Sequence, residues 1–384
     1  MCLALLLMIA IPSLVVFLHP LSIHMARRKA KKQGNSDSWR PSISLVIPLA
    51  SQEEFAEENF SSYLFQKNLG PYEIIFVAED PAYPSARIAS SLSSVYSNVN
   101  SKVVYSGKTN GSVDKMHNLH RGIRDCKNDI IVFVDSDVRF VNAEEIKKLI
   151  APLKSADVGL VTAAPQYHLP HTLGGHLLAT MINADLWGYF SVLALLGKLN
   201  VANGAILAMR RSMLTRIGNL EDLKQQILND TIIARRVSNE GKRIFLSHHP
   251  AYIPTSSLSM SEWWAQAVRW HIAMRMVLPK TEYFLYGLLR SPVLLGILSF
   301  LLCPDNPYRL VFLVLPIVAR MVSFGGIQFA WMKEKSGLLG LLFVPFTDMI
   351  SPLIWGYSWM QNRINWRGKS YSVQKGGIAI SNGN

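Results

Sequence analysis

The sequence predicts an α/β fold with a mostly parallel sheet, flanked by transmembrane helices. Uncharged apolar runs gather at the two ends of the chain, whereas charged residues dominate the stretch from about residue 41 to residue 275. Within that stretch, short β-branched runs alternate with polar segments long enough to carry crossover helices. The 384 residues are 49% apolar, more than in a typical soluble protein. We therefore expect a water-exposed domain, residues 41–277, between membrane segments.

Five strands are expected where β-branched and apolar residues cluster, at residues 43–47, 73–77, 102–105, 130–134 and 158–162. Strands that alternate with helices form βαβ units, which build parallel sheets. Such sheets bind ligands outside the carboxyl ends of their strands. The residues directly after the strands are therefore the first site candidates, namely Pro48, Glu79 with Asp80, and the run Asp135-Ser136-Asp137.

Residues 1–22 are expected to form an N-terminal transmembrane anchor. The stretch 1–18 carries no charge, and a basic cluster follows it, made of Arg27, Arg28, Lys29, Lys31 and Lys32. A secretory signal peptide carries its positive charges before the apolar run, so an anchor fits better. Positive flanks face the cytosol, which places the domain after residue 27 on the cytosolic side.

A C-terminal membrane region is expected over residues 278–360, followed by a basic tail at 361–384. Apolar runs close to the roughly 20 residues that cross a bilayer lie near 285–303, 308–331 and 338–360. Three crossings would put the basic tail outside, against the positive-inside rule. Pro345, Asp348 and Pro352 also interrupt the last run. We therefore expect two to three segments, one of them re-entrant or interfacial.

The charge pattern indicates a membrane partner and argues against nucleic acid. The formal net charge is +13, but much of the excess lies beside the apolar segments, where it contacts anionic lipid head groups. The three cysteines, Cys2, Cys126 and Cys303, form no CxxC metal motif and no disulfide framework.

The strongest local signal is the segment IIVFVDSDVRF, residues 130–140. An apolar strand that ends in Asp135 and Asp137 places two carboxylates at a strand terminus, where they can hold a divalent metal that carries a diphosphate. A solvated turn is the alternative, because Asp and Ser favour turns.

Two later segments also have two interpretations. Asp230 opens a helix that is expected to run from residue 229 to about Glu240 and to stop at Gly241, so it is either a functional carboxylate or part of a helix cap. Gln266, Arg269 and Trp270 lie in an amphipathic stretch that leads into the membrane, where an interfacial helix with an aromatic belt is the alternative.

The order of these four signals is more specific than any one of them. An acidic pair after the second strand, Asp-x-Asp after the fourth, a later Asp and a QxxRW segment beside the membrane resemble the D, D, D, QxxRW pattern of inverting processive and lipid-acceptor glycosyltransferases.

Within that group the chain resembles the ceramide glucosyltransferases. The resemblance rests on Val158-Gly159-Leu160-Val161 before Pro165, on Asp230 with ARRVSNEGKRIFLS, on SLSMSEWWAQAVRW followed by Arg275 and Leu278-Pro279, and on INWRGKSYSVQKGG. It spans nearly the whole chain. One position departs, because Asn229 stands where the family usually has Glu. Bacterial hopanoid-modifying transferases are also similar.

The resemblance implies a GT-A fold, a UDP-sugar donor and Mg²⁺ or Mn²⁺ as cofactor. Asp137, with Asp135, would hold the metal on the diphosphate. Asp230 would be the general base that deprotonates the lipid hydroxyl. Pro48 is a further donor-binding candidate, and Glu79 or Asp80 would bind the uracil ring. Lys115 and Asn118 would lie near the nucleotide. Gln266, Arg269 and Trp270 would serve the diphosphate and the acceptor.

The implied reaction is inverting transfer of glucose from UDP-glucose to the primary hydroxyl of ceramide, a step of sphingolipid metabolism. Another acceptor such as a hopanoid stays open, as does a processive polysaccharide synthase, although three or four membrane segments are few for a polymer channel. A non-catalytic membrane scaffold is a third reading, against which the intact carboxylates argue. The expected location is the Golgi or endoplasmic reticulum of a eukaryote, or a bacterial inner membrane, with the catalytic domain in the cytosol.

Overall fold

The computed structural model describes residues 2–33, 39–109, 113–218, 220–329, 339–366 and 369–381. The chain divides into two compact units. We call Met25–Pro165 with Leu193–Pro254 the sheet unit. We call Met1–His24, Gln166–Val192 and Thr255–Asn384 the helical unit.

The sheet unit is built on a seven-stranded sheet in the order β3-β2-β1-β4-β7-β5-β8. The strands are β1 (Ile43–Pro48), β2 (Tyr72–Ala78), β3 (Asn100–Tyr105), β4 (Ile130–Val134), β5 (Val158–Thr162), β7 (Ile206–Arg210) and β8 (Arg243–Leu246). β1 pairs in parallel with β2 and β4, whereas β7 runs antiparallel between β4 and β5. The five expected strands and the mostly parallel sheet are confirmed, and β7 and β8 extend the sheet.

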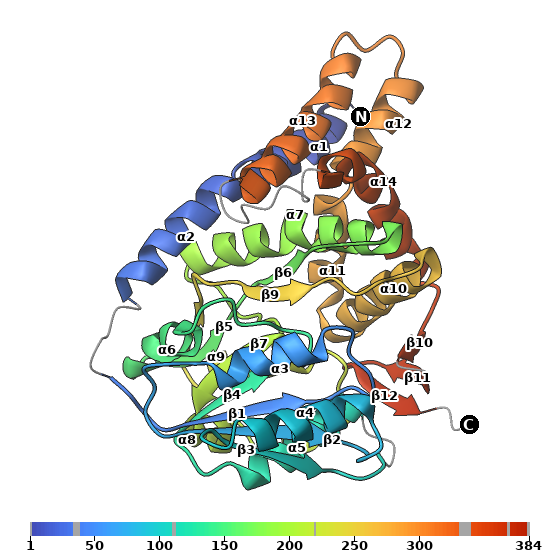
Figure 1. Ribbon diagram of the computed structural model, residues 1–384. Coiled ribbons are helices and arrows are strands. Elements are labelled where there is room, and N and C mark those ends of the chain that lie inside the picture. The colour runs from blue at the N-terminus through green and yellow to red at the C-terminus, as the bar shows by residue number, and fades with distance from the viewer. Residues whose placement is uncertain are drawn as a thin grey trace. The chain divides into compact units, whose positions relative to one another are not determined.

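Helices cover this sheet (Figure 1). They are α3 (Ala56–Leu64), α4 (Pro84–Val95), α5 (Asp114–Asp125), α6 (Glu145–Ile150), α8 (Arg211–Arg216) and α9 (Asn229–Asn239), with short 3-10 turns at Ala151–Lys154 and Glu221–Leu223. α5 packs closely on β1 and β2, since a Cβ at Gly122 would lie 2.5 Å from the Val46 side chain. β1 and β4 are buried along their whole length, so the core follows the centre of the sheet.

The helical unit holds the apolar helices and the end of the chain. Its helices are α1 (Cys2–Phe17), α7 (Leu173–Leu195, with its last turn in the sheet unit), α10 (Met260–Val277), α11 (Lys280–Leu289), α12 (Pro292–Leu302), α13 (Arg309–Ile327) and α14 (Gly340–Ser358). Residues expected as a basic tail form an antiparallel sheet of β10 (Arg363–Trp366), β11 (Lys369–Gln374) and β12 (Ile378–Ser381). α2 (His19–Gln33) continues from α1, and β6 (Pro165–His168) and β9 (Ala251–Pro254) are short.

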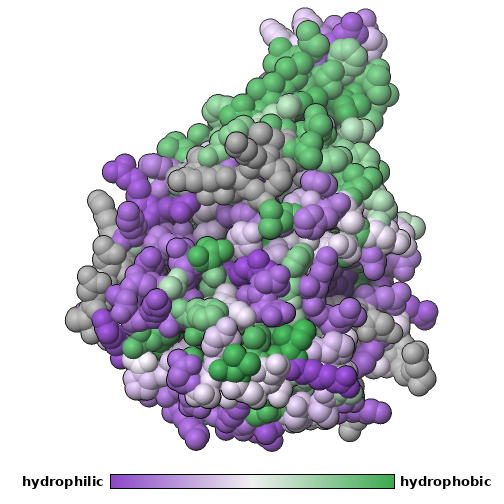
Figure 2. All heavy atoms as spheres, viewed as in Figure 1, coloured by the Kyte–Doolittle hydropathy of each residue, from purple (hydrophilic) through white to green (hydrophobic). Residues whose placement is uncertain are grey.

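Among the described residues, three helices are long and apolar enough to cross a membrane: Leu7–Lys31, Leu173–Leu195 and Arg309–Ile327. α11 and α12 are bent by 64° relative to each other, and counting this bent pair as one span gives a fourth candidate. Hydrophobic side chains gather on the part of the helical unit built from α1, α12 and α13 (Figure 2). The first and third candidates match the expected anchor and the run near 308–331, and the bent pair matches the run near 285–303.

The candidate span at α7 was not expected. Its mean hydropathy is 1.3, against 2.2 for α13, because polar residues such as His176, Asn183 and Asp185 interrupt the apolar ones. The sequence pattern therefore places this stretch within the water-exposed domain.

Candidate active site

The loop after β4, residues 135–138, is held in place by α3 and the segment before it. The Tyr63 hydroxyl lies 3.2 Å from the Asp135 carbonyl oxygen and 2.5 Å from that of Val138, and donates toward both. The Asn59 amide donates to the carbonyl of Ser136 at 3.2 Å, and the Ser136 hydroxyl donates to Glu53 at 2.5 Å. Burial, and then the nearby carboxylates of Asp137, Glu53 and Asp135, raise the pKa of Tyr63 well above its usual value. The Asp-Ser-Asp segment thus forms a turn, closed by the bond from the Val138 N–H to the Asp135 carbonyl at 3.1 Å, that α3 and Glu53 hold in place.

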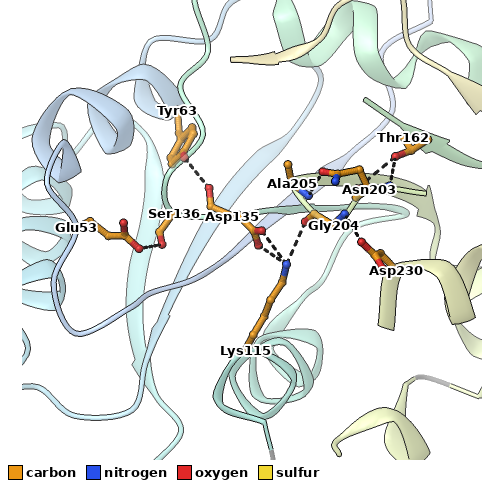
Figure 3. Close-up of polar contacts among 10 residues, drawn as sticks. All are labelled: Glu53, Tyr63, Lys115, Asp135, Ser136, Thr162, Asn203, Gly204, Ala205 and Asp230. Atoms are coloured by element: carbon orange, nitrogen blue, oxygen red, sulfur yellow. Dashed lines mark hydrogen bonds and ion pairs between the residues drawn. The ribbon is translucent and has the colours of Figure 1, made fainter. Parts of the chain in front are cut away.

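Lys115, on α5, connects this loop with a second loop. Its ammonium group lies 2.6 and 2.8 Å from the two carboxylate oxygens of Asp135 and donates to the carbonyl of Gly204 at 3.2 Å (Figure 3). The side chains are 17% exposed for Lys115 and 29% exposed for Asp135. Ion pairs at this degree of burial are less screened than surface pairs. The amine therefore balances the negative charge of Asp135 through both of its carboxylate oxygens.

Asp230 lies on the other side of the same loop. Its Oδ2 accepts the backbone N–H of Gly204 at 2.8 Å, and its Oδ1 accepts that of Thr231 at 2.7 Å (Figure 3). α9 begins at Asn229 and its N-cap is Leu228, which makes no side-chain cap bond, so Asp230 is not the N-cap residue. The helix ends at Asn239 before Gly241, which has φ +69°, as expected.

The pKa of Asp230 is raised above its ordinary value. Burial is the largest cause; the charge of Lys115 and the N–H bonds from Thr231 and Gly204 oppose it, and Asp135 adds to it. A carboxylate with a raised pKa is a stronger base, which suits proton abstraction from a hydroxyl.

The loop at residues 203–205 is the part of the site that the sequence analysis missed. Asn203 exchanges bonds with the Thr162 hydroxyl, the carbonyl of Ala205 accepts the backbone N–H of Asp135 at 3.0 Å, and Gly204 contacts both Lys115 and Asp230. A Cβ at Gly204 would lie 3.0 Å from the Lys115 Nζ and 3.2 Å from the Asp230 Oδ2. The sequence signal that could have found it is a Gly directly before an apolar strand, at a point of close backbone approach.

The remaining candidates of the sheet unit lie at the ends of β1 and β2. Pro48 is the buried last residue of β1 and pairs with Val77. Glu79 accepts from the Tyr83 hydroxyl at 3.2 Å and from the backbone N–H of Thr109 at 3.4 Å, whereas Asp80 accepts the N–H of Ala82 at 2.8 Å. Both carboxylates thus occur just after β2, as the strand pattern predicts.

Asn118 lies on α5, three residues after Lys115, and its amide joins two loops. Its Oδ1 accepts from the Ser106 hydroxyl at 2.6 Å and its Nδ2 donates to the carbonyl of Leu49 at 3.3 Å. The side chain is buried, so it fixes the residues that follow β1 and β3.

Gln266, Arg269 and Trp270 lie on α10 of the helical unit. This helix begins with a capping box between Ser259 and Glu262. Arg269 donates to the Gln266 amide oxygen at 3.3 Å, and its guanidinium lies over the rings of Trp270 at 6.0 Å and Trp366 at 4.8 Å. Trp366 belongs to β10, so the C-terminal segment that supported the resemblance packs on the QxxRW motif.

A divalent metal fits the carboxylates after β4. Oxygen ligands suit Mg²⁺ and Mn²⁺, and Mg²⁺ is often held by one or two protein carboxylates while phosphates and water complete its shell. The described part of the chain contains no group of three or more His, Cys, Asp or Glu that could hold an ion by itself. An ion at Asp137 and Asp135 would therefore need further oxygen ligands, such as those of a diphosphate or of water.

Comparisons with known proteins agree over most of the chain. The model of glycosyl transferase family 21 matches residues 5–379. Ceramide glucosyltransferase 3 of Caenorhabditis elegans is 20% identical over 368 residues, covering 94% of this chain and 79% of that protein. Ceramide glucosyltransferase 1 of the same organism is 19% identical over 381 residues, 95% of this chain and 78% of that protein.

A solved structure supports the fold. The mannosyltransferase PcManGT from Pyrobaculum calidifontis, solved with GDP-mannose and Mn²⁺, is 14% identical and has a TM-score of 0.53 over 92% of this chain and 98% of that one. The expected GT-A fold is thereby confirmed.

Proposed function

The chain belongs to glycosyl transferase family 21, and we propose that it transfers glucose from UDP-glucose to the primary hydroxyl of ceramide with inversion at the anomeric carbon. It is a hexosyltransferase. One observation carries the proposal: Lys115 and Gly204 join the Asp135 carboxylate, which follows β4, to Asp230, a half-buried carboxylate of raised pKa. The donor-binding group Asp135, through Lys115, and the base Asp230 thus both connect to the loop at residues 203–205.

In the proposed reaction, Asp230 accepts the proton of the acceptor hydroxyl. Its two backbone N–H donors orient the carboxylate, and each oxygen keeps a lone pair that can accept the proton. Mg²⁺ or Mn²⁺, held by Asp137 with Asp135, would neutralise charge on the departing diphosphate. The positive charge of Lys115 stabilises the same region, because it lies against Asp135.

The other donor roles come from position and motif. Glu79 or Asp80 accepts from the uracil ring, Pro48 and Asn118 shape the loops around the nucleotide, and Gln266, Arg269 and Trp270 serve the diphosphate and the acceptor. We further propose a cytosolic active site on an internal membrane, since the basic flank after the first apolar run favours that side.

The test is transfer by the purified full chain in detergent with UDP-glucose and ceramide. We expect glucosylceramide by mass spectrometry, with the β-anomer from the α-linked donor by NMR, and loss of product when a chelator removes divalent metal. Matched reactions would offer a hopanoid, or an elongating glucan without lipid.

Product on the hopanoid alone, or a growing glucan, would assign the enzyme to another acceptor. The absence of both donor hydrolysis and transfer, in a sample that binds UDP, would favour a scaffold.

A further inference from the structure

Cationic and imidazole groups from three separate segments of the sheet unit act on one another. Arg27 and Lys31 lie four residues apart on α2, Lys148 lies on α6, and His248 and His249 follow β8. The charges of Arg27, Lys148 and Lys31 reach the His248 ring, and those of His248, Lys148 and Arg27 reach the His249 ring. We call these five residues the cationic cluster.

The two histidines of the cluster are neutral at pH 7. Burial first, and then the neighbouring positive charges, lower the pKa of His248 to about 4 and that of His249 to about 3. Within the described ranges, burial and positive charges are the causes of both shifts, with no carboxylate among them. The rings lie 4.0 Å apart, and the buried Nε2 of His249 has no hydrogen-bond partner in the described part of the chain. Buried polar atoms are normally satisfied, so this nitrogen is a candidate for a hydrogen bond to a group outside the chain.

The cluster is separate from the donor site. β8, which precedes the histidines, is the edge strand of the sheet, three positions from β4 and its Asp135. Neighbouring strands lie about 4.8 Å apart, so the two strands are separated by roughly 14 Å. A diphosphate bound at Asp135 would therefore not reach the histidine loop.

α2 connects the cluster to the membrane. Arg27 and Lys31 are in the last turns of the candidate span Leu7–Lys31. Leu18, just before α2, and Leu21 and Met25 on it are exposed at 42%, 54% and 50%, and within this span they recur at a spacing typical of one apolar face. A helix with an apolar face and a basic end favours the level of the lipid head groups.

We propose that the cationic cluster binds the phosphate of an anionic membrane phospholipid. Arg27, Lys31 and Lys148 supply positive charge, and the neutral imidazoles supply N–H donors. The cluster thus combines the basic flank of the anchor with groups from α6 and the loop after β8, and it does not depend on the identity of the sugar acceptor.

The test compares lipids that stay with the purified full chain. The protein is extracted into mixed micelles of phosphatidylcholine and phosphatidylserine and washed, and the retained lipids are quantified by mass spectrometry. We expect several-fold enrichment of phosphatidylserine on the wild type and loss of that enrichment in Lys148→Glu and His249→Ala. Lys127→Glu makes the same charge change at an exposed lysine before β4 and should keep it.

Far-ultraviolet circular dichroism and the thermal midpoint of each variant check that it folds. Equal retention of both lipids by the wild type, or equal loss in Lys127→Glu, would overturn the proposal. Full displacement of phosphatidylserine by inorganic phosphate at similar concentration would show a free-phosphate site instead of a lipid site.

Discussion

At the scale of single residues, Asp230 separates catalysis from helix capping. A general base acts only on the acceptor hydroxyl, so Asp230→Asn should keep UDP-glucose affinity while the transfer rate falls by about two to four orders of magnitude. Asn is about as good a helix cap as Asp, so a capping role alone predicts almost no change. Lipid glycosylation by the folded, donor-binding variant is the measurement.

Asp222→Asn is the matched control, because Asp222 belongs to the same region and pairs with Arg236 at the surface. A variant at Asp230 that keeps more than about a tenth of the wild-type rate would contradict the base role, since that loss is under about 1.4 kcal/mol of barrier. The wild-type rate should also fall toward acid, because the base must be deprotonated, and its raised pKa places that fall above the usual range of Asp.

The sequence predicted the carboxylates of the site and missed what joins them. Asp135, Asp137 and Asp230 stand out because each follows or opens an element at a recognisable distance. Lys115 was identified by resemblance alone, and Gly204 was not identified. Its contact with Asp230 spans 26 positions and its contact with Lys115 spans 89, and no local pattern reports such pairs.

At the scale of elements, an ionic network joins four helices of the helical unit. Arg320 of α13 makes paired bonds to Asp348 of α14, one of them 2.7 Å long, and also contacts Asp185 of α7. Arg290, directly after α11, lies 2.6 Å from Asp185. Arg320, Asp185, Asp348 and Arg290 are each less than about a sixth exposed in their side chains. Charges buried in such a unit need partners, so these contacts fix which helix faces meet.

Arg320→Met should destabilise the helical unit by about 3–5 kcal/mol, because Asp348 is left buried without its partner. Adding Asp348→Leu removes that orphaned charge and should recover much of the loss. The measurement is the thermal midpoint of the purified chain in detergent.

Arg309→Met, at the start of the same helix, is the control for losing an arginine from α13. If Arg320→Met unfolds at the wild-type midpoint, the network contributes no net stability. If the double variant is no better than the single one, the cost is not that of an unpaired carboxylate.

Element prediction succeeded where periodicity is strong. β1 to β5 occur at the expected places because each is a short buried run of β-branched and apolar residues. β10 to β12 were not expected, since their residues are mixed in polarity; β11 pairs with both β10 and β12, and β10 and β11 pack against α10. α7 combines membrane-like length with Asp185, and its role depends on the partners that Asp185 finds in other helices.

At the scale of the whole molecule, chain connections limit which candidate spans cross. β5 precedes α7 and β7 follows it, and the two strands pair in one sheet through Val161 and Ala208. If α7 crossed a bilayer, one of its linkers would have to recross the hydrocarbon as irregular chain with unsatisfied backbone groups. We therefore infer that α7 does not cross, although its length and composition permit it.

The C-terminal tail returns to the side of α10. Arg275 of α10 donates to the carbonyl of Gln361 at 2.6 Å. The N–H of Gly376 donates to the carbonyl of Met276, also on α10, at 2.8 Å. The helices α11 to α14 lie between these partners in the chain, so they cross an even number of times. Two crossings satisfy this, one by the bent pair α11–α12 and one by α13, while α14 does not cross the bilayer. This arrangement agrees with the positive-inside prediction, which puts Arg27 to Lys280 and the tail after Arg363 on the same side.

Single cysteines in sealed right-side-out vesicles, which keep the cytosolic face inside, test this topology. In a background with the native cysteines replaced by Ser, a membrane-impermeant thiol reagent should label Asp305→Cys, between α12 and α13, from outside. Lys127→Cys and Lys375→Cys, in the sheet unit and in the tail, should react only after the membrane is permeabilised. Both are exposed positions, so failure to react cannot be ascribed to burial. Labelling of Lys375→Cys but not Lys127→Cys from outside would mean an odd number of crossings, which the contact between Arg275 and Gln361 forbids.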